Sequence, residues 1–119
     1  MATKTAYPFR VEPQEVDFSL RITLVALGGN ILNIAGIDAH TKGFGVDALN
    51  KDNFSWVLSR IAFEFDYRPE EYVKYEIATW ISDYGRMLST RNFELTDQTG
   101  VCFGRVVSQW CMLLSLIHI

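Results

Sequence analysis

The longest early pattern in the chain is that of a helix. From about Ser19 to Thr41 the apolar residues recur three and four positions apart, which is the spacing of one helix face. Ser19 is expected to cap the start of this helix, and the glycines after Thr41 are expected to end it. No side chain between Ile22 and Ile37 is charged, so we expect the helix to be buried on most sides.

After position 53 the pattern changes to a period of two residues, which is typical of strands. In the first such segment Arg60 and Glu64 share one side. The other, apolar side consists of Val57, Ile61, Phe63 and Phe65. Short polar turns separate the later segments. We expect strands at 54–65, 72–81, 86–96 and 101–112, with a brief extended segment at 9–11.

These elements predict an α+β protein. Because short turns join the predicted strands, we expect consecutive strands to be antiparallel neighbours. The strands are longer than the usual length of about five or six residues, and a long sheet can curl around a helix. The sequence therefore predicts one antiparallel β-sheet wrapped around one long central helix.

Composition excludes several classes of function. The chain has 119 residues, of which 49% are hydrophobic and 21% charged, as in one globular domain. With 11 Lys and Arg against 14 Asp and Glu its net charge is −3, which does not favour a nucleic-acid partner. Every apolar stretch is interrupted before the ~20 residues that a membrane span needs.

The cysteines and the first residues indicate the compartment. Cys102 and Cys111 lie on one predicted strand, too far apart for a disulfide, so both are expected to be free thiols. No spacing of Cys and His indicates a metal site. The first residues carry no targeting pattern. We therefore expect a soluble, cytoplasmic protein without a metal.

Short motifs along the chain resemble one known family. They are Val16-Asp17-Phe18, Leu27-Gly28, Ile31-Leu32-Asn33-Ile34-Ala35-Gly36, Ala39-His40, Gly43-Phe44-Gly45, Leu49-Asn50, Asn53, Trp56-Val57-Leu58-Ser59-Arg60, Thr79-Trp80, Arg91-Asn92-Phe93, Asp97, Gly100, Ser108 and Trp110. Together they resemble the N-terminal half of bacterial acyl-[acyl-carrier-protein] thioesterases, which are similar to the plant fatty-acyl thioesterases. The resemblance runs over about residues 9–112.

This resemblance implies the hotdog fold, with two tandem hotdog domains in the complete enzyme. The family hydrolyses the thioester of a fatty acyl chain on the phosphopantetheine of acyl carrier protein, in fatty acid biosynthesis, without a cofactor. Its catalytic residues lie in the second hotdog, so none is carried over to this chain. Residues 1–113 are then expected to be one acyl-binding hotdog that pairs with a second hotdog, in the same chain or as a homodimer. Residues 114–119 do not continue the family pattern and are expected to be a non-native tail.

Four residues are candidates for contact with the substrate. Asn33 and His40 lie two helical turns apart and project from roughly one face, where an amide and an imidazole could polarise a thioester carbonyl. The same two residues could instead only make hydrogen bonds near the helix end. Trp56 could line an apolar acyl tunnel or pack in the core.

The fourth candidate, Arg60, could contact the phosphopantetheine or an acidic group of the carrier protein, or pair with a neighbouring strand. Lys42 and Lys51 are weaker candidates for the same basic patch.

Two other functions remain open at this point. A stand-alone, non-catalytic hotdog would bind acyl groups or assemble as a dimer. A stand-alone catalytic hotdog dimer would use Asp17, or the pair Asn33 and His40. Asp17 resembles the acidic residue that many single-domain hotdog thioesterases carry ahead of the helix, but in a first-half domain the structural role is the one expected.

Overall fold

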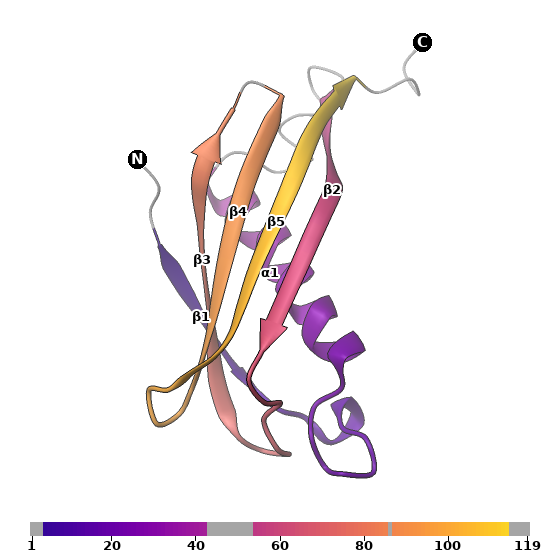
Figure 1. Ribbon diagram of the computed structural model, residues 1–119, viewed down its shortest axis with the longest axis vertical. Coiled ribbons are helices and arrows are strands. Elements are labelled where there is room, and N and C mark those ends of the chain that lie inside the picture. Colours follow the sequence, from indigo (N-terminus) through magenta and orange to yellow (C-terminus); the bar gives the residue numbers. More distant parts are fainter. Residues whose placement is uncertain (1–3, 43–53, 86, 115–119) are drawn as a thin grey trace.

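The computed structural model describes residues 4–42, 54–85 and 87–114, which form one antiparallel sheet with a long helix across one face (Figure 1). The strands are β1 (Thr5–Arg10), β2 (Phe54–Phe65), β3 (Lys74–Tyr84), β4 (Leu88–Asp97) and β5 (Cys102–Leu114). The helices are the short 3-10 helix η1 (Pro13–Glu15) and α1 (Leu24–Thr41). The expected α+β class is confirmed, and each long strand lies within three residues of its predicted bounds.

The order of the strands differs from the expectation at one point. The sheet runs β1-β3-β4-β5-β2, so β2 and β3 are not neighbours although a short segment joins them. That segment runs from β2, at one edge of the sheet, to β3, near the opposite edge. It is hydrogen-bonded to the loop that precedes α1. Ile22 N donates to Pro69 O at 2.9 Å, and Glu71 N donates to Leu20 O at 2.8 Å. A polar turn pattern does not distinguish such a crossing from a hairpin, which is why the prediction was wrong here.

A β-bulge in β2 changes which side chains share a face. Leu58 pairs with Trp110 but Arg60 pairs with Gln109, so one extra residue enters β2 between them. Val57 is therefore on the outer face of the sheet, with 44% of its surface exposed, and not on the side of Ile61 as expected. Arg60 still shares the outer face with Glu64, as the sequence predicted.

The start of α1 is capped by Thr23 and not by Ser19. The Thr23 hydroxyl accepts from Ala26 N at 3.1 Å. Ser19 instead donates to the Asp17 carboxylate. Leu20, which lies between Ser19 and Thr23, has φ 62°, a left-handed conformation that cannot belong to a right-handed helix. The apolar spacing of a helix extends upstream of Thr23, but the helical backbone conformation begins only after Thr23.

Only one face of α1 is buried. It carries Leu27, Ile31, Ile34, Ala35 and Asp38. On the other sides Val25 is 88% exposed and Ile37 is 42% exposed. The expectation of burial on most sides is wrong for the described part of the chain, because the sheet covers the helix from a single direction (Figure 1).

The core lies between α1 and the sheet. It contains Val11, Ile22, Leu27, Ile31, Ile34, Ala35, Tyr75, Ile77, Phe93, Leu95, Phe103 and Val106. Phe9 stacks on Tyr75 with ring centroids 5.4 Å apart, which ties the edge strand β1 to this core. The edge strand β1 therefore packs against the core between α1 and the sheet.

The remaining expectations concern the turn after Asp97, the two cysteines and the end of β5. The turn after Asp97 is a hairpin in which Gly100 has φ 90°, a conformation that suits glycine. Cys102 and Cys111 are free thiols. Leu114 of the expected tail pairs with Phe54, whereas 115–119 and the glycines after Thr41 lie outside the described residues. In the described ranges no helix is long and apolar enough to cross a membrane.

Candidate functional site

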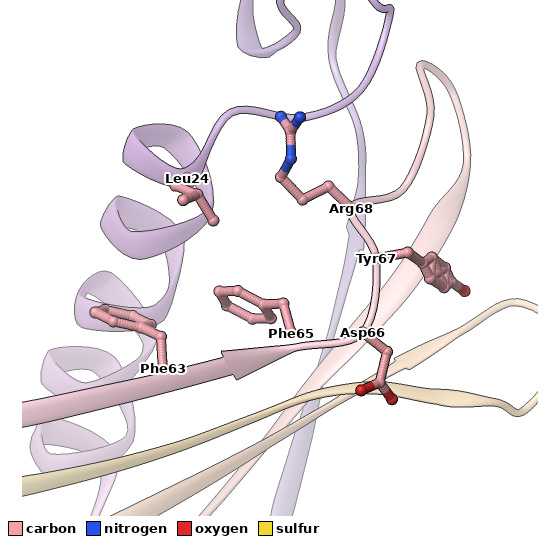
Figure 2. A pocket seen from close by; sticks show the side chains of 6 residues that line it. All are labelled: Leu24, Phe63, Phe65, Asp66, Tyr67 and Arg68. Carbon is pink, nitrogen blue, oxygen red and sulfur yellow. The ribbon is translucent and has the colours of Figure 1, made fainter.

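An apolar pocket of about 490 Å³ opens between the start of α1 and the end of β2 (Figure 2). Its lining consists of Leu24, Phe63, Phe65, Asp66, Tyr67 and Arg68. Figure 2 shows the rings of Phe63 and Phe65 between the strand and the helix, with the Arg68 guanidinium beside the loop that leads into α1. The volume falls within the range of small-ligand sites, and an apolar wall with a few polar groups is their usual lining.

Two glycines determine where the phenylalanine rings lie. Phe65 lies over Gly104 of β5, so closely that a Cβ atom on Gly104 would be 2.4 Å from Phe65 Cδ1. On the helix, a Cβ atom on Gly28 would be 3.8 Å from Phe63 Cζ, an ordinary contact. A larger side chain at Gly104 would therefore displace the Phe65 ring and reshape the pocket wall, whereas an alanine at Gly28 would fit against Phe63.

The polar end of the pocket is rigid. Arg68 Nη1 donates to Asp17 Oδ2 at 3.0 Å and to Ile22 O at 2.8 Å, and Arg21 Nη1 donates to Arg68 O at 2.8 Å. Hydrogen bonds from the Ser19 side chain and from Arg68 lower the pKa of Asp17 to about 2. A carboxyl with so low a pKa is a poor general base near neutral pH. The contacts of Asp17 thus support its structural reading.

A second polar group, which sequence analysis did not single out, is buried under the sheet. Asp38 on α1 is fully buried and accepts hydrogen bonds from β1, from β4 and from the residue that follows α1. Arg91 Nη1 lies 2.6 Å from Asp38 Oδ2, Lys42 Nζ lies 2.9 Å from the same oxygen, and Tyr7 Oη lies 2.8 Å from Oδ1. Arg91 Nη1 also donates to Thr79 Oγ1 at 3.1 Å. This group joins α1 to β1, β3 and β4.

The hydrogen bonds decide the ionisation of this group. Burial alone would raise the pKa of Asp38, but the donors Arg91, Lys42 and Tyr7 outweigh it and hold that pKa below its usual value. Burial and the nearby Asp38 carboxylate raise the pKa of Tyr7 to about 12. Asp38 is therefore a carboxylate at neutral pH.

The group continues across the sheet to β5. Ser108 Oγ donates to Arg91 O at 2.9 Å, and Trp110 Nε1 donates to Ser108 Oγ at 2.9 Å. We call the four buried residues Asp38, Thr79, Arg91 and Ser108 the polar belt. One sequence signal pointed to it, because Asp38 is the only charged residue on the apolar stripe that includes Ile31 and Ile34.

None of the four predicted substrate contacts lines the pocket. Asn33 and His40 lie on exposed sides of α1, and Arg60 lies on the outer face of the sheet. Trp56 is half-buried near the start of β2 and pairs with Met112, which places it on the helix side of the sheet. The structure does not bring the four together.

Two lysines were weaker candidates for the basic patch. Lys42 binds Asp38 as described, and Lys51 lies outside the described residues. Within the described ranges no three Asp, Glu, His or Cys side chains are placed to hold a metal ion.

Comparison with known proteins identifies the fold and the family. Residues 2–114 match the acyl-ACP thioesterase N-terminal domain. An acyl-ACP thioesterase from Bacteroides thetaiotaomicron has the same fold with a TM-score of 0.93 and 40% identity, over 98% of this chain and 48% of that chain. The oleoyl-acyl carrier protein thioesterase 2 of Arabidopsis thaliana is 28% identical over 112 residues, which are 88% of this chain and 30% of the relative.

A more distant structure agrees in fold. The 12:0-ACP thioesterase from Umbellularia californica superposes with a TM-score of 0.84 at 20% identity, over 93% of this chain and 43% of that chain. The architecture is thus the hotdog fold, and the chain spans about half the length of the solved acyl-ACP thioesterases it matches. Because the match covers nearly all of its residues, the chain belongs to the acyl-ACP thioesterase family, of which it carries the N-terminal domain.

Proposed function

We propose that this chain is the acyl-binding half of an enzyme that hydrolyses fatty acyl-acyl carrier protein and releases free fatty acid. The pocket between α1 and β2 carries this proposal, since it is apolar, open at the sheet edge and large enough for part of a linear acyl chain. Membership of the thioesterase family supplies the reaction. Burial of each CH₂ group contributes about 0.8 kcal/mol, so such a pocket can read chain length as affinity.

The partners follow from the same proposal. The first is acyl carrier protein, with the acyl chain on its phosphopantetheine. The second is another hotdog domain, in the same protein or as a homodimer, which would supply the chemistry. β2 supports the second partner, because among the described residues this 12-residue strand lies at the end of the sheet and pairs on one side only, with β5. Residues 1–113 would then be one domain of a longer enzyme, and a non-native tail would begin only after Leu114, because Leu114 is the last residue of β5 and pairs with Phe54.

The four predicted substrate contacts belong to this proposal too. Asn33, His40 and Arg60 are exposed, so a second domain or a carrier protein could reach them. Trp56 would contact the acyl group from the helix side of the sheet. Free thiols at Cys102 and Cys111 support a reducing, cytoplasmic setting.

A non-catalytic acyl-binding or dimerisation module is the alternative, and the edge position of β2 among the described strands is the observation that favours it. The proposed function and an acyl-binding module both predict acyl binding by this chain, whereas a pure dimerisation module does not. The proposed function and the alternative differ in what happens when a second domain is added.

Release of free thiol from a panel of acyl-carrier-protein thioesters distinguishes them. The chain is assayed alone and after fusion to the second half of a related thioesterase. We expect hydrolysis by the fusion only. Hydrolysis by the chain alone would mean that the catalytic residues are within it, and no hydrolysis by a folded fusion would favour the binding module.

A further inference from the structure

The helix side of the sheet is not apolar throughout. Apolar side chains fill the part beneath the first half of α1, and the polar belt then crosses β3, β4 and β5 to meet Asp38. Arg91 and Ser108 lie opposite each other in the ladder between β4 and β5. The belt therefore divides the layer between helix and sheet into two parts.

The register places the pocket directly beside this boundary. Phe63, a wall of the pocket, pairs with Val106, and the next residues on the same side are Ile61 and Ser108, which pair with each other. Two residues along a strand span about 6.6 Å. The next residue on this side of β5 is Trp110, whose indole N–H donates a hydrogen bond to the Ser108 hydroxyl.

Displacing the belt would leave buried charges unpaired, so an apolar ligand does not displace it. Arg91 and Asp38 have only 6% and 1% of their side-chain surface exposed, and each depends on the other. Moving the methyl end past the belt would separate this ion pair, which costs more than the roughly fourfold gain in affinity that one further CH₂ group contributes. A methyl end that reaches the belt gains nothing by pushing further.

We propose that the polar belt is the stop that limits the length of the acyl chain bound by this domain. The proposal rests on the proposed function and adds the residues that set its specificity. The ligand is a linear, saturated acyl chain whose methyl end points from the pocket toward Ser108 and Arg91. Its polar head stays at the open end of the pocket, near Arg68.

The test is calorimetric binding of saturated fatty acids, from hexanoate to octadecanoate, to the 119-residue chain. We expect the affinity to rise about fourfold per CH₂ group and then to stop rising at one chain length, the break. In the double variant Asp38→Leu with Arg91→Met, which removes both charges together, the break should move to longer chains. Glu64→Gln is the control, because it removes an ion pair with Arg105 on the outer face and should leave the break unchanged.

A second variant decides the question if the double variant does not fold. Val106→Thr extends the polar surface one step toward the pocket with little change of shape. We expect it to weaken binding of the longest accepted chains by at least about fourfold, the worth of one CH₂ group, and to leave hexanoate unchanged. Circular dichroism checks that each variant is folded.

The outcomes separate the two proposals. If the unmodified chain binds no fatty acid, the proposed function fails and the stop fails with it. If it binds them but shows no break, or if the folded belt variants keep the break of the unmodified chain, the stop alone is wrong. A break that moves in opposite directions in the two variants supports it.

Discussion

Arg91 and Asp38 form a buried ion pair that joins the last turns of α1 to the middle of the sheet, with 2.6 Å between Arg91 Nη1 and Asp38 Oδ2. Asp38→Leu leaves the arginine charge buried without its main partner, so we expect a loss of about 3–5 kcal/mol in the free energy of unfolding. Arg91→Met added to it should restore much of that loss. Urea unfolding of the two single variants and the double variant measures both effects, and additive losses would contradict the pairing.

The start of α1 gives a second prediction. Thr23→Ala removes the hydroxyl that caps the helix and should lower the free energy of unfolding by about 1 kcal/mol. Ser19→Ala is the matched variant: it removes the hydroxyl that donates to Asp17 outside the helix, so its cost, unlike that of Thr23→Ala, should fall as the pH falls toward about 2. Urea unfolding at neutral pH and near pH 2 separates the two variants, and a cost of Thr23→Ala that vanished at low pH would contradict the cap.

The close contact between Gly104 and Phe65 gives a third. Gly104→Ala must push the Phe65 ring into the pocket, so we expect a loss of about 1–3 kcal/mol in stability and weaker fatty acid binding. Gly29→Ala is the matched control, because no atom lies within 4 Å of a Cβ atom there and alanine favours a helix by up to about 1 kcal/mol. Urea unfolding should show a loss of stability for Gly104→Ala and a gain for Gly29→Ala, and calorimetry should show the weaker fatty acid binding of Gly104→Ala. Equal effects of the two variants would argue against the tight fit.

Asp17 predicts how stability responds to acid. Its pKa is lowered from 3.8 to about 2 in the folded chain, so its contribution is present above pH 3.8 and is lost as the pH falls toward about 2. Asp17→Asn should therefore make the free energy of unfolding depend less steeply on pH between about 4 and 2. Unfolding curves over that range check this, and an unchanged slope would mean that the contacts with Ser19 and Arg68 do not form. Added salt should weaken the effect, because the carboxylate is near the surface.

The site was less accessible to sequence reasoning than the fold. The resemblance pointed to an acyl-binding domain, but the residues chosen for contact, Asn33 and Arg60 among them, do not line the pocket. Phe63 and Phe65 were assigned to an apolar strand side, and nothing in their spacing distinguished core from pocket wall. That distinction depends on how far the start of α1 lies from β2, which is a distance between elements far apart in the sequence.

By itself the sequence determined the helix that ends at Thr41, the long strands and the hairpin at Gly100, because periodicity and turn chemistry act between residues close along the chain. Only the tertiary structure decided that β2 pairs with β5, that the bulge beside Leu58 turns Val57 outward, and that Asp38 meets Arg91 beneath the sheet. These features depend on contacts between distant segments. Their free energy comes from burial and hydrogen bonding that exist only once the segments have come together.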